Sequence, residues 1–272
     1  MKFTTTIASA LACTSAVLGA PGTAMRRERA AKRLAAQRGS SPRQDPDDGV
    51  MYAVDNNNGT EAHVQYSSNW AGAVLIGTGY TSVTGTIVVP TPSTPSGGSS
   101  NTEYAASAWV GIDGDTCSTA ILQTGVDFYV EGGEVAFDAW YEWYPDYAYD
   151  FSGITISAGD TIKMTVTASS KTGGTAVIQN QSTGKSVSHT FSSQSASLCE
   201  TNAEWIVEDF SSSGGLVPFA DFDSVTFTGA SATTSSGTVG VSGATIFDIR
   251  QNSDVLTSCS TSGSSSVTCS YT

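Results

Sequence analysis

The sequence predicts an all-β domain, a sandwich or a barrel, from about residue 56 to residue 272. Short runs of β-branched, aromatic and alternating apolar residues recur along this part of the chain, separated by Gly, Ser, Thr, Asp and Pro. No segment after residue 50 has a convincing 3.6-residue period, which would mark an amphipathic helix. Many short strands with regular turns are typical of sandwiches and barrels.

About twelve strands are expected, each bounded by turn-forming residues. Composition marks 90–103 and 229–244 as loops, because Gly, Ser, Thr and Pro dominate them. In order along the chain, the expected strands are 69–76, 83–89, 105–112, 119–130, 135–145, 161–168, 174–180, 185–191, 201–210, 224–229, 244–250 and 266–272.

Residues 1–20 have the pattern of a secretory signal peptide. Lys2 precedes an apolar run from about Ile7 to Leu18, and small residues follow at the end. The apolar run is too short to span a bilayer, and no later stretch approaches the required ~18–20 apolar residues. We therefore expect a secreted, soluble protein with no membrane partner.

Residues 21–55, here called the basic segment, differ in composition from everything that follows. They hold seven of the twelve Lys and Arg residues, whereas beyond residue 50 four basic residues face 21 acidic ones, a net charge of 4 − 21 = −17. A basic segment before an acidic domain is typical of a pro-segment, and a disordered basic tail or linker is the alternative. Charge complementarity predicts an inhibitor that binds the domain at neutral pH and leaves once carboxylates protonate.

The remaining domain, 56–272, is long enough for one core. Its composition lacks the basic footprint of a nucleic-acid binder. At pH 7 the domain repels itself, which favours a monomer, and around pH 3 most carboxylates are neutral. The composition therefore favours a protein that works in acid.

Four cysteines remain once Cys13 leaves with the signal peptide, an even number in an oxidising compartment. Three pairings are possible. Cys259 and Cys269 flank a turn, which favours a local bridge and leaves Cys117 with Cys199. A zinc site is disfavoured because the sequence has no CxxC motif and no histidine cluster.

The usual hydrolase motifs are absent. His63 and His189 are the only histidines, and there is no GxSxG, DTG, HExxH, P-loop or dinucleotide fingerprint. Neither a cofactor nor a metal is therefore expected. Below about pH 4 a histidine is protonated and useless as a base, so an acid-adapted hydrolase needs a carboxylate base and a neutral donor for the oxyanion.

Three strands carry polar groups among apolar ones. In TNAEWIVEDF, Glu204 and Glu208 share a face with Ile206, and strand rise separates the two carboxylates by roughly 13 Å. In AILQTGVDF, Gln123 and Asp127 share a face. In FDAWYEWYP, the shared face holds Asp138, Trp140, Glu142 and Tyr144. Such carboxylates more often face solvent or hold loop amides, so each one alone is weak evidence of chemistry.

Five blocks in this order, SNWAGAVL, SAWVGIDGDTC, AILQTG, DAWYEWYPD and TNAEWIVEDF, resemble the glutamic peptidases, also called eqolisins. The resemblance runs from about Ser68 to the C-terminus. It implies a β-sandwich of two seven-stranded antiparallel sheets and a secreted acid endopeptidase that cleaves proteins and peptides.

The resemblance also implies the site residues. Glu208 would be the base that activates a water, and Gln123 would hold that water and donate to the oxyanion. Trp109, Asp113, Asp127 and Glu142 are expected to line or support the cleft. The pattern departs at 211–219, which lack a cysteine loop that some members carry.

Two other functions remain open at this point. A glycosidase could use a carboxylate pair, here Glu142 and Glu208, if the two lie about 5–9 Å apart. A glycan-binding module would explain the fold and the tryptophans but not a removable basic segment.

Overall fold

The computed structural model describes residues 28, 31–32, 35–54 and 61–272, and residues 37–272 form one compact unit. The expected signal peptide lies outside the described residues. In the first unit, residues 1–36, the described positions Glu28, Ala31, Lys32 and Ala35 have helical backbone. Within the described parts of the chain, no helix is long and apolar enough to cross a membrane.

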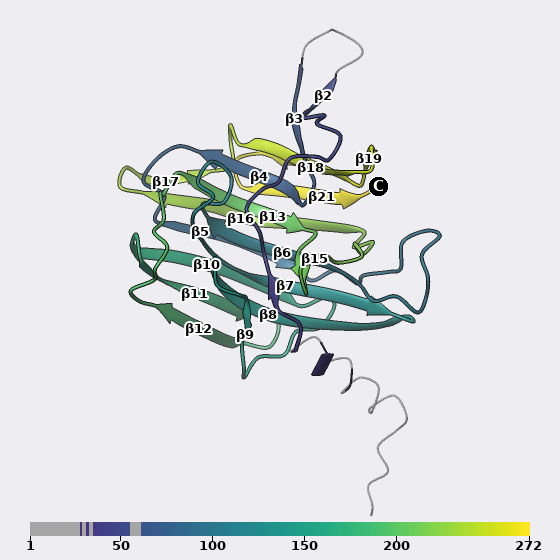
Figure 1. Cartoon of the computed structure of the whole chain (residues 1–272). Helices are drawn as coiled ribbons and strands as arrows, with labels where there is room; N and C mark the ends of the chain where they lie inside the picture. Colours follow the sequence, from purple (N-terminus) through teal and green to yellow (C-terminus); the bar gives the residue numbers. More distant parts are fainter. Residues whose placement is uncertain (1–27, 29–30, 33–34, 55–60) are drawn as a thin grey trace, which may run out of the picture. The chain divides into compact units, whose positions relative to one another are not determined.

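Two large sheets lie face to face in the second unit, which confirms the expected β-sandwich (Figure 1). All twelve expected strands form, and each sheet has seven strands of six or more described residues, as the resemblance implied. Shorter strands raise the totals to ten and eight. The ten-stranded sheet contains β2 (Tyr52–Val54), β3 (Glu61–Ser67), β18 (Thr245–Gln251), β4 (Trp70–Ile76), β13 (Asn202–Glu208), β6 (Tyr104–Ile112), β7 (Ile121–Glu131), β8 (Glu134–Tyr144) and β9 (Tyr149–Asp150) in spatial order, with β19 (Asp254–Val255) beside β18.

The second sheet covers one face of the first. Its strands are β12 (Lys185–Phe191), β11 (Gly173–Asn180), β10 (Thr161–Ser170), β5 (Ser82–Val88), β16 (Ser224–Thr234), β21 (Ser266–Tyr271) and β20 (Thr257–Ser262), with β17 (Gly237–Gly240) beside β16. A small third sheet joins the basic segment to a loop of the domain. It consists of β1 (Arg38–Gly39), β14 (Ser211–Ser212) and β15 (Gly215–Leu216).

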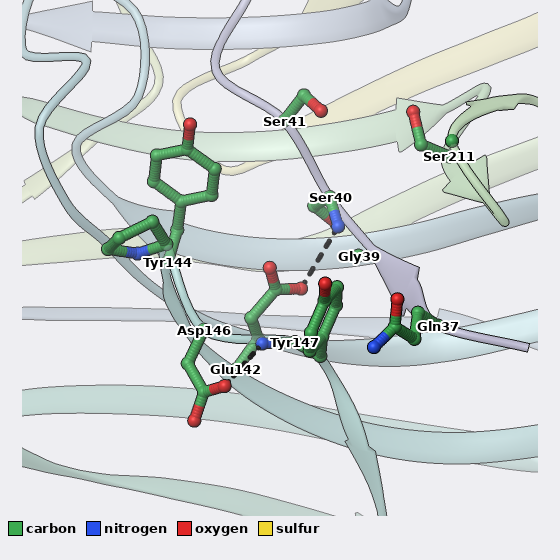
Figure 2. Close-up of a pocket in the computed structure, with 11 residues that line it drawn as sticks. Gln37, Gly39, Ser40, Ser41, Glu142, Tyr144, Asp146, Tyr147 and Ser211 are labelled. Carbon is green, nitrogen blue, oxygen red and sulfur yellow. Dashed lines mark hydrogen bonds between the residues drawn. The ribbon is translucent and has the colours of Figure 1, made fainter.

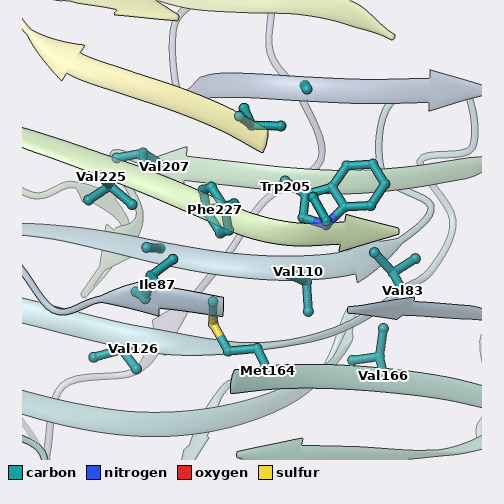
Figure 3. Close-up of a cluster of buried hydrophobic side chains, with 14 of the residues drawn as sticks. Val83, Ile87, Val110, Val126, Met164, Val166, Trp205, Val207, Val225 and Phe227 are labelled. Atoms are coloured by element: carbon teal, nitrogen blue, oxygen red, sulfur yellow. The ribbon is translucent and has the colours of Figure 1, made fainter. Parts of the chain in front are cut away.

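The core lies between the two large sheets, where alternate residues of each strand meet (Figure 3). Val110, Val126 and Trp205 face it from the ten-stranded sheet. The Trp205 indole reaches across and donates from Nε1 to the carbonyl of Thr84, at 2.8 Å. Because the inward positions are apolar, the polar residues of the same strands must point to the opposite, outer face.

Three expectations about local structure need correction. The strand 61–67 runs parallel to β18, so the sheet is not wholly antiparallel. The 257–262 strand was not expected. The prediction that 229–244 is a loop is wrong, because β16 continues to Thr234 and pairs with β17. Ala230 and Ala232 are buried on alternate positions, so small residues preserve the strand pattern where composition suggested a loop.

Two disulfides join the cysteines in the pairing that the sequence favoured. One links Cys117, in the connection between β6 and β7, to Cys199, just before β13. The other links Cys259 on β20 to Cys269 on β21, which lie opposite each other in the strand register. The first of these holds the start of β13 against the β6–β7 connection.

Candidate active site

The polar residues of β13, β6, β7 and β8 form rows across the outer face of the ten-stranded sheet. One row runs Glu208, Ser107, Asp127 and Asp138 through consecutive strand pairs. A second row, four residues away along the strands, runs Glu204, Gly111, Gln123 and Glu142. Period two predicted which residues share a face, and the register now places β7 beside β8 and only β6 between these strands and β13.

An apolar patch lies between and around these rows on the same face of the sheet. It consists of Trp70, Val74, Trp109, Ile121, Trp140, Ile206 and Phe247, all of them buried. Trp70 and Trp109 meet edge to face, with ring centroids 4.9 Å apart. A low-polarity surrounding strengthens every hydrogen bond and ion pair made there, and raises the cost of each unpaired group.

Glu208 ends β13 and is fully buried. Its Oε2 accepts a hydrogen bond from the Trp109 indole Nε1 at 2.8 Å, and its Oε1 accepts one from the Ser41 backbone amide at 3.1 Å. Burial raises the pKa of Glu208 to about 7, although Arg38 and the hydrogen bonds act in the opposite direction. With the basic segment in place, this carboxyl therefore holds its proton in acid.

Gln123 is the third residue of β7, and neither its Oε1 nor its Nε2 has a hydrogen-bond partner among the described residues. Leaving a buried amide unpaired costs about 1–3 kcal/mol for each group. The Trp109 ring and Gln123 both lie close to Gly111. A Cβ on Gly111 would lie 2.7 Å from Trp109 Cζ3 and 3.3 Å from Gln123 Cβ. One indole therefore reaches from beside Gln123 to a hydrogen bond with Glu208, and only a glycine fits at 111.

The basic segment crosses this face and covers it. Arg38 is buried, its guanidinium donating from Nε and Nη2 to the two oxygens of Asp127 at 2.6 and 2.7 Å. It lies against the rings of Trp140 and Phe210, 3.9 and 4.6 Å from their centroids. A bidentate arginine–carboxylate pair between two rings is among the stronger polar contacts a protein makes.

Glu142 contacts the same segment. Figure 2 shows its carboxylate pointing at Ser40, whose amide donates to Glu142 Oε2 at 3.1 Å. Arg38 Nη1 lies 3.5 Å from the same oxygen. Burial raises the pKa of Glu142 well above its usual value, despite the opposing effect of Arg38. A pocket of about 240 Å³ remains beside the segment, bounded by Glu142 and by the turn at Tyr144 and Tyr147.

Asn69 and Trp70 also contact the basic segment, and the sequence reasoning did not single them out. The carbonyl of Ser41 accepts from Trp70 Nε1 at 3.0 Å and from Asn69 Nδ2 at 3.3 Å. The Asn69 Oδ1 accepts from the Gln44 amide at 2.8 Å. The only sequence feature that could have pointed to Asn69 and Trp70 is that they lie in SNWAGAVL. This block supports the resemblance, but no role was assigned to its residues.

Asp113 lies away from the carboxylate rows, at the end of β6. Its two oxygens accept hydrogen bonds from the backbone amides of 199–202, at 2.7–3.2 Å. It therefore holds the chain that enters β13. Asp113, Cys117 and Cys199 are close enough to suggest a metal site among the described residues, but the two cysteines are joined in a disulfide and cannot ligate an ion.

The strand that carries Glu208 also contains a carboxyl that no donor holds. Neither oxygen of Glu204 has a hydrogen-bond partner among the described residues. Burial, followed by the charges of Asp113 and Asp115, raises the pKa of Glu204 well above its usual value. The group is therefore kept neutral by its apolar surroundings.

With this geometry in view, the chain was compared with known proteins. The model of the Peptidase A4 family matches residues 68–271. The chain belongs to this family. It is therefore a glutamic endopeptidase. Its activity is peptide hydrolysis, and the two alternatives, a glycosidase and a glycan-binding module, are set aside.

Two curated relatives of this peptidase match over the whole of both chains. Aspergillopepsin-2 from Aspergillus niger is 56% identical over 286 residues, and Scytalidopepsin B from Scytalidium lignicola is 47% identical over 283 residues. Two solved structures share its fold. Scytalido-glutamic peptidase with a transition state analog inhibitor is 49% identical with a TM-score of 0.69, covering 75% of this chain and 98% of that one. Aspergilloglutamic peptidase from Aspergillus niger is 65% identical with a TM-score of 0.61, covering 62% and 99%.

Proposed function

We propose that this glutamic peptidase is secreted and hydrolyses proteins in acid, with Glu208 and Gln123 as its catalytic pair. The observation that carries the proposal is the contrast between these two buried groups. Glu208 is held by a hydrogen bond from Trp109, whereas the Gln123 amide has no partner among the described residues. A buried amide left open on the same face of the sheet as a held carboxyl, with Trp109 between the two strands that carry them, is suited to receive a substrate.

The chemistry needs neither a metal nor a covalent intermediate. Ionised Glu208 takes a proton from a water as that water attacks the peptide carbonyl, and Gln123 Nε2 donates to the oxyanion. Glu208 then passes the proton to the leaving nitrogen. Trp109, whose Nε1 binds Oε2 of Glu208, leaves Oε1 for the water and the leaving group.

The basic segment is proposed to inhibit the enzyme until it is removed. Its Ser41 amide occupies Glu208 Oε1, the oxygen that would bind the water. In the described part of the segment no carbonyl is bonded to Gln123, so no peptide bond there is polarised for attack. Removal of the segment would expose Glu208 to water and reduce the burial that is the largest cause of its raised pKa, and it would also remove Arg38 and the Ser41 amide, which lower that pKa.

The first experiment measures cleavage of an unfolded protein between pH 2 and pH 5 by the mature enzyme and by two glutamate variants. Glu208→Gln removes the base with little change of shape, and we expect it to abolish detectable cleavage. Glu204→Gln is the matched control, a buried glutamate on the same face of the same strand, and it should retain activity within a few-fold.

Two results would overturn the assignment. Full cleavage by Glu208→Gln would show that another carboxyl is the base. Activity that peaks at neutral pH would contradict the acid mechanism.

A further inference from the structure

Two side chains of the cleft converge on one carbonyl of the basic segment. We propose that Asn69 and Trp70 form a clamp for the main-chain carbonyl of the substrate residue that follows the scissile bond. The inference rests on the proposed role of Glu208 and extends it to substrate positioning.

The contacts of Ser41 carry the first step. Its amide donates to Glu208 Oε1 at 3.1 Å, and its own carbonyl accepts from Trp70 Nε1 at 3.0 Å and Asn69 Nδ2 at 3.3 Å. Asn69 Nδ2 also lies 3.3 Å from the carbonyl oxygen of Pro42. A single peptide residue therefore connects the catalytic carboxyl to the two donors. Any peptide that reaches Glu208 along the same path meets them.

The chemistry of Glu208 assigns the position. Its last task is to give a proton to the nitrogen that leaves, so this nitrogen must lie within about 2.6–3.2 Å of the carboxyl. The Ser41 nitrogen lies at such a distance from Oε1. Ser41 therefore occupies the place of the first residue after the scissile bond, and the clamp holds the carbonyl of that residue.

The clamp is rigidly supported by the domain itself. Asn69 and Trp70 are fully buried, and the Ser67 hydroxyl donates to Asn69 Oδ1 at 3.0 Å, so the amide is oriented with Nδ2 toward the segment. The Asn69 carbonyl accepts from the amide of Asp209, the residue after Glu208, at 2.9 Å. Trp70 lies opposite Glu208 in the register of β4 and β13. Clamp and base are therefore parts of one assembly.

The function of the clamp follows from what it contacts. It binds main chain and no side chain, so it fixes the leaving residue in every substrate sequence. Holding that carbonyl keeps the leaving nitrogen over Glu208 during proton transfer, and such positioning can contribute substantially to rate.

The test compares two peptides on the mature enzyme and on Trp70→Phe, which keeps the ring and removes the indole donor. The second peptide carries an E-alkene in place of the peptide bond after the leaving residue, so it lacks the clamped carbonyl. Loss of one buried hydrogen bond is worth about 10-fold in affinity or rate. We expect Trp70→Phe to lower kcat/KM about 10-fold more for the ordinary peptide than for the alkene peptide, with the difference mainly in kcat.

Equal losses on both peptides, or no loss on either, would overturn the clamp. Glu208→Gln separates this failure from that of the proposed function, because it should abolish cleavage of both peptides whatever Trp70 does. If the Trp70→Phe variant does not fold, a second measurement on the wild-type enzyme tests the clamp instead. A 37–48 peptide with an E-alkene at Ser41–Pro42 should inhibit the wild-type enzyme about 10-fold more weakly than the natural peptide, and equal inhibition would contradict the proposal.

Discussion

Glu204 and Glu208 lie on one face of β13 but differ in their hydrogen-bond partners. Glu208 receives hydrogen bonds from Trp109 and from the basic segment, while Glu204 receives none from the described residues. Burial raises the pKa of both groups. The different roles proposed for the two carboxyls therefore rest on the donor beside each one and on access to a peptide, rather than on burial.

Gln123 provides the sharpest prediction for a single residue. Gln123→Ala should lower kcat by about 10²–10³, the cost of losing one oxyanion donor, and leave KM within a few-fold. Steady-state kinetics on a peptide at acid pH measures both constants. Gln179→Ala, an exposed glutamine on the other sheet, is the control and should behave as wild type. A raised KM with an unchanged kcat would instead make Gln123 a substrate-binding residue.

Strand pairing builds the site at the scale of elements. β6 lies between β13 and β7 and contributes Ser107, Trp109 and Gly111 to the outer face. Trp109 contacts groups on both sides of it, and the absence of a side chain at Gly111 gives its ring room. Strand β6 thus carries Trp109 and Gly111, which lie between Glu208 on β13 and Gln123 on β7.

β1 is the element through which the basic segment attaches, and it suggests a test of inhibition. A peptide of residues 21–55 should inhibit the mature enzyme near pH 6, and Arg38→Ala in that peptide should weaken inhibition about 100-fold or more. Arg38 is desolvated and bidentate on Asp127, and deleting one partner of a buried pair leaves the other uncompensated. Inhibition constants measured with each peptide give the comparison.

Arg43 is the matched control for this peptide. Its ion pair with the domain is a single contact from Nε to Asp115, and its other partner, Asp45, belongs to the peptide itself, so Arg43→Ala should weaken inhibition less than Arg38→Ala does. Inhibition by the natural peptide should also weaken as the pH falls, because the acidic domain loses the negative charge that attracts a basic peptide. Equal losses for the two arginines would contradict an anchor at Arg38.

The buried acids give the whole molecule a stability that depends on pH. Burial, as the largest effect, raises the pKa of Asp209 to about 8 and that of Asp248 to about 7, and raises that of Glu204. The folded chain keeps these protons at pH values where the unfolded chain has released them. The free energy of unfolding should therefore fall as the pH rises above about 4, by up to about 1.4 kcal/mol per pH unit for each of Asp248 and Asp209, until about pH 7 for the first and about pH 8 for the second.

Chemical unfolding of the full chain at pH 3–8 tests this prediction, in the Glu208→Gln background so that the enzyme does not digest itself. Adding Glu204→Gln removes one titrating group and should make the fall shallower. Stability that peaks near neutral pH would contradict the account. Growing repulsion among the surface carboxylates acts in the same direction as the buried groups.

The sequence by itself determined the strands, the face on which each polar residue lies, and the absence of the common hydrolase motifs. Period two is a local property, so β7, β8 and β13 could each be predicted with their correct outer faces. The resemblance then supplied the family and named Glu208 and Gln123. The loop expected at 229–244 was wrong because alternation through small residues has little compositional signature.

Only the tertiary structure decided which residues meet. A shift of two residues between strands preserves every face but moves each side chain by about 7 Å, so register is invisible to a pattern of faces. The same holds for contacts between distant segments. Ser41 and Glu208 are 167 residues apart and Arg38 and Asp127 are 89 apart, so no local pattern encodes either contact. A role for Asn69 and Trp70 can be inferred only from the Ser41 carbonyl to which both donate hydrogen bonds.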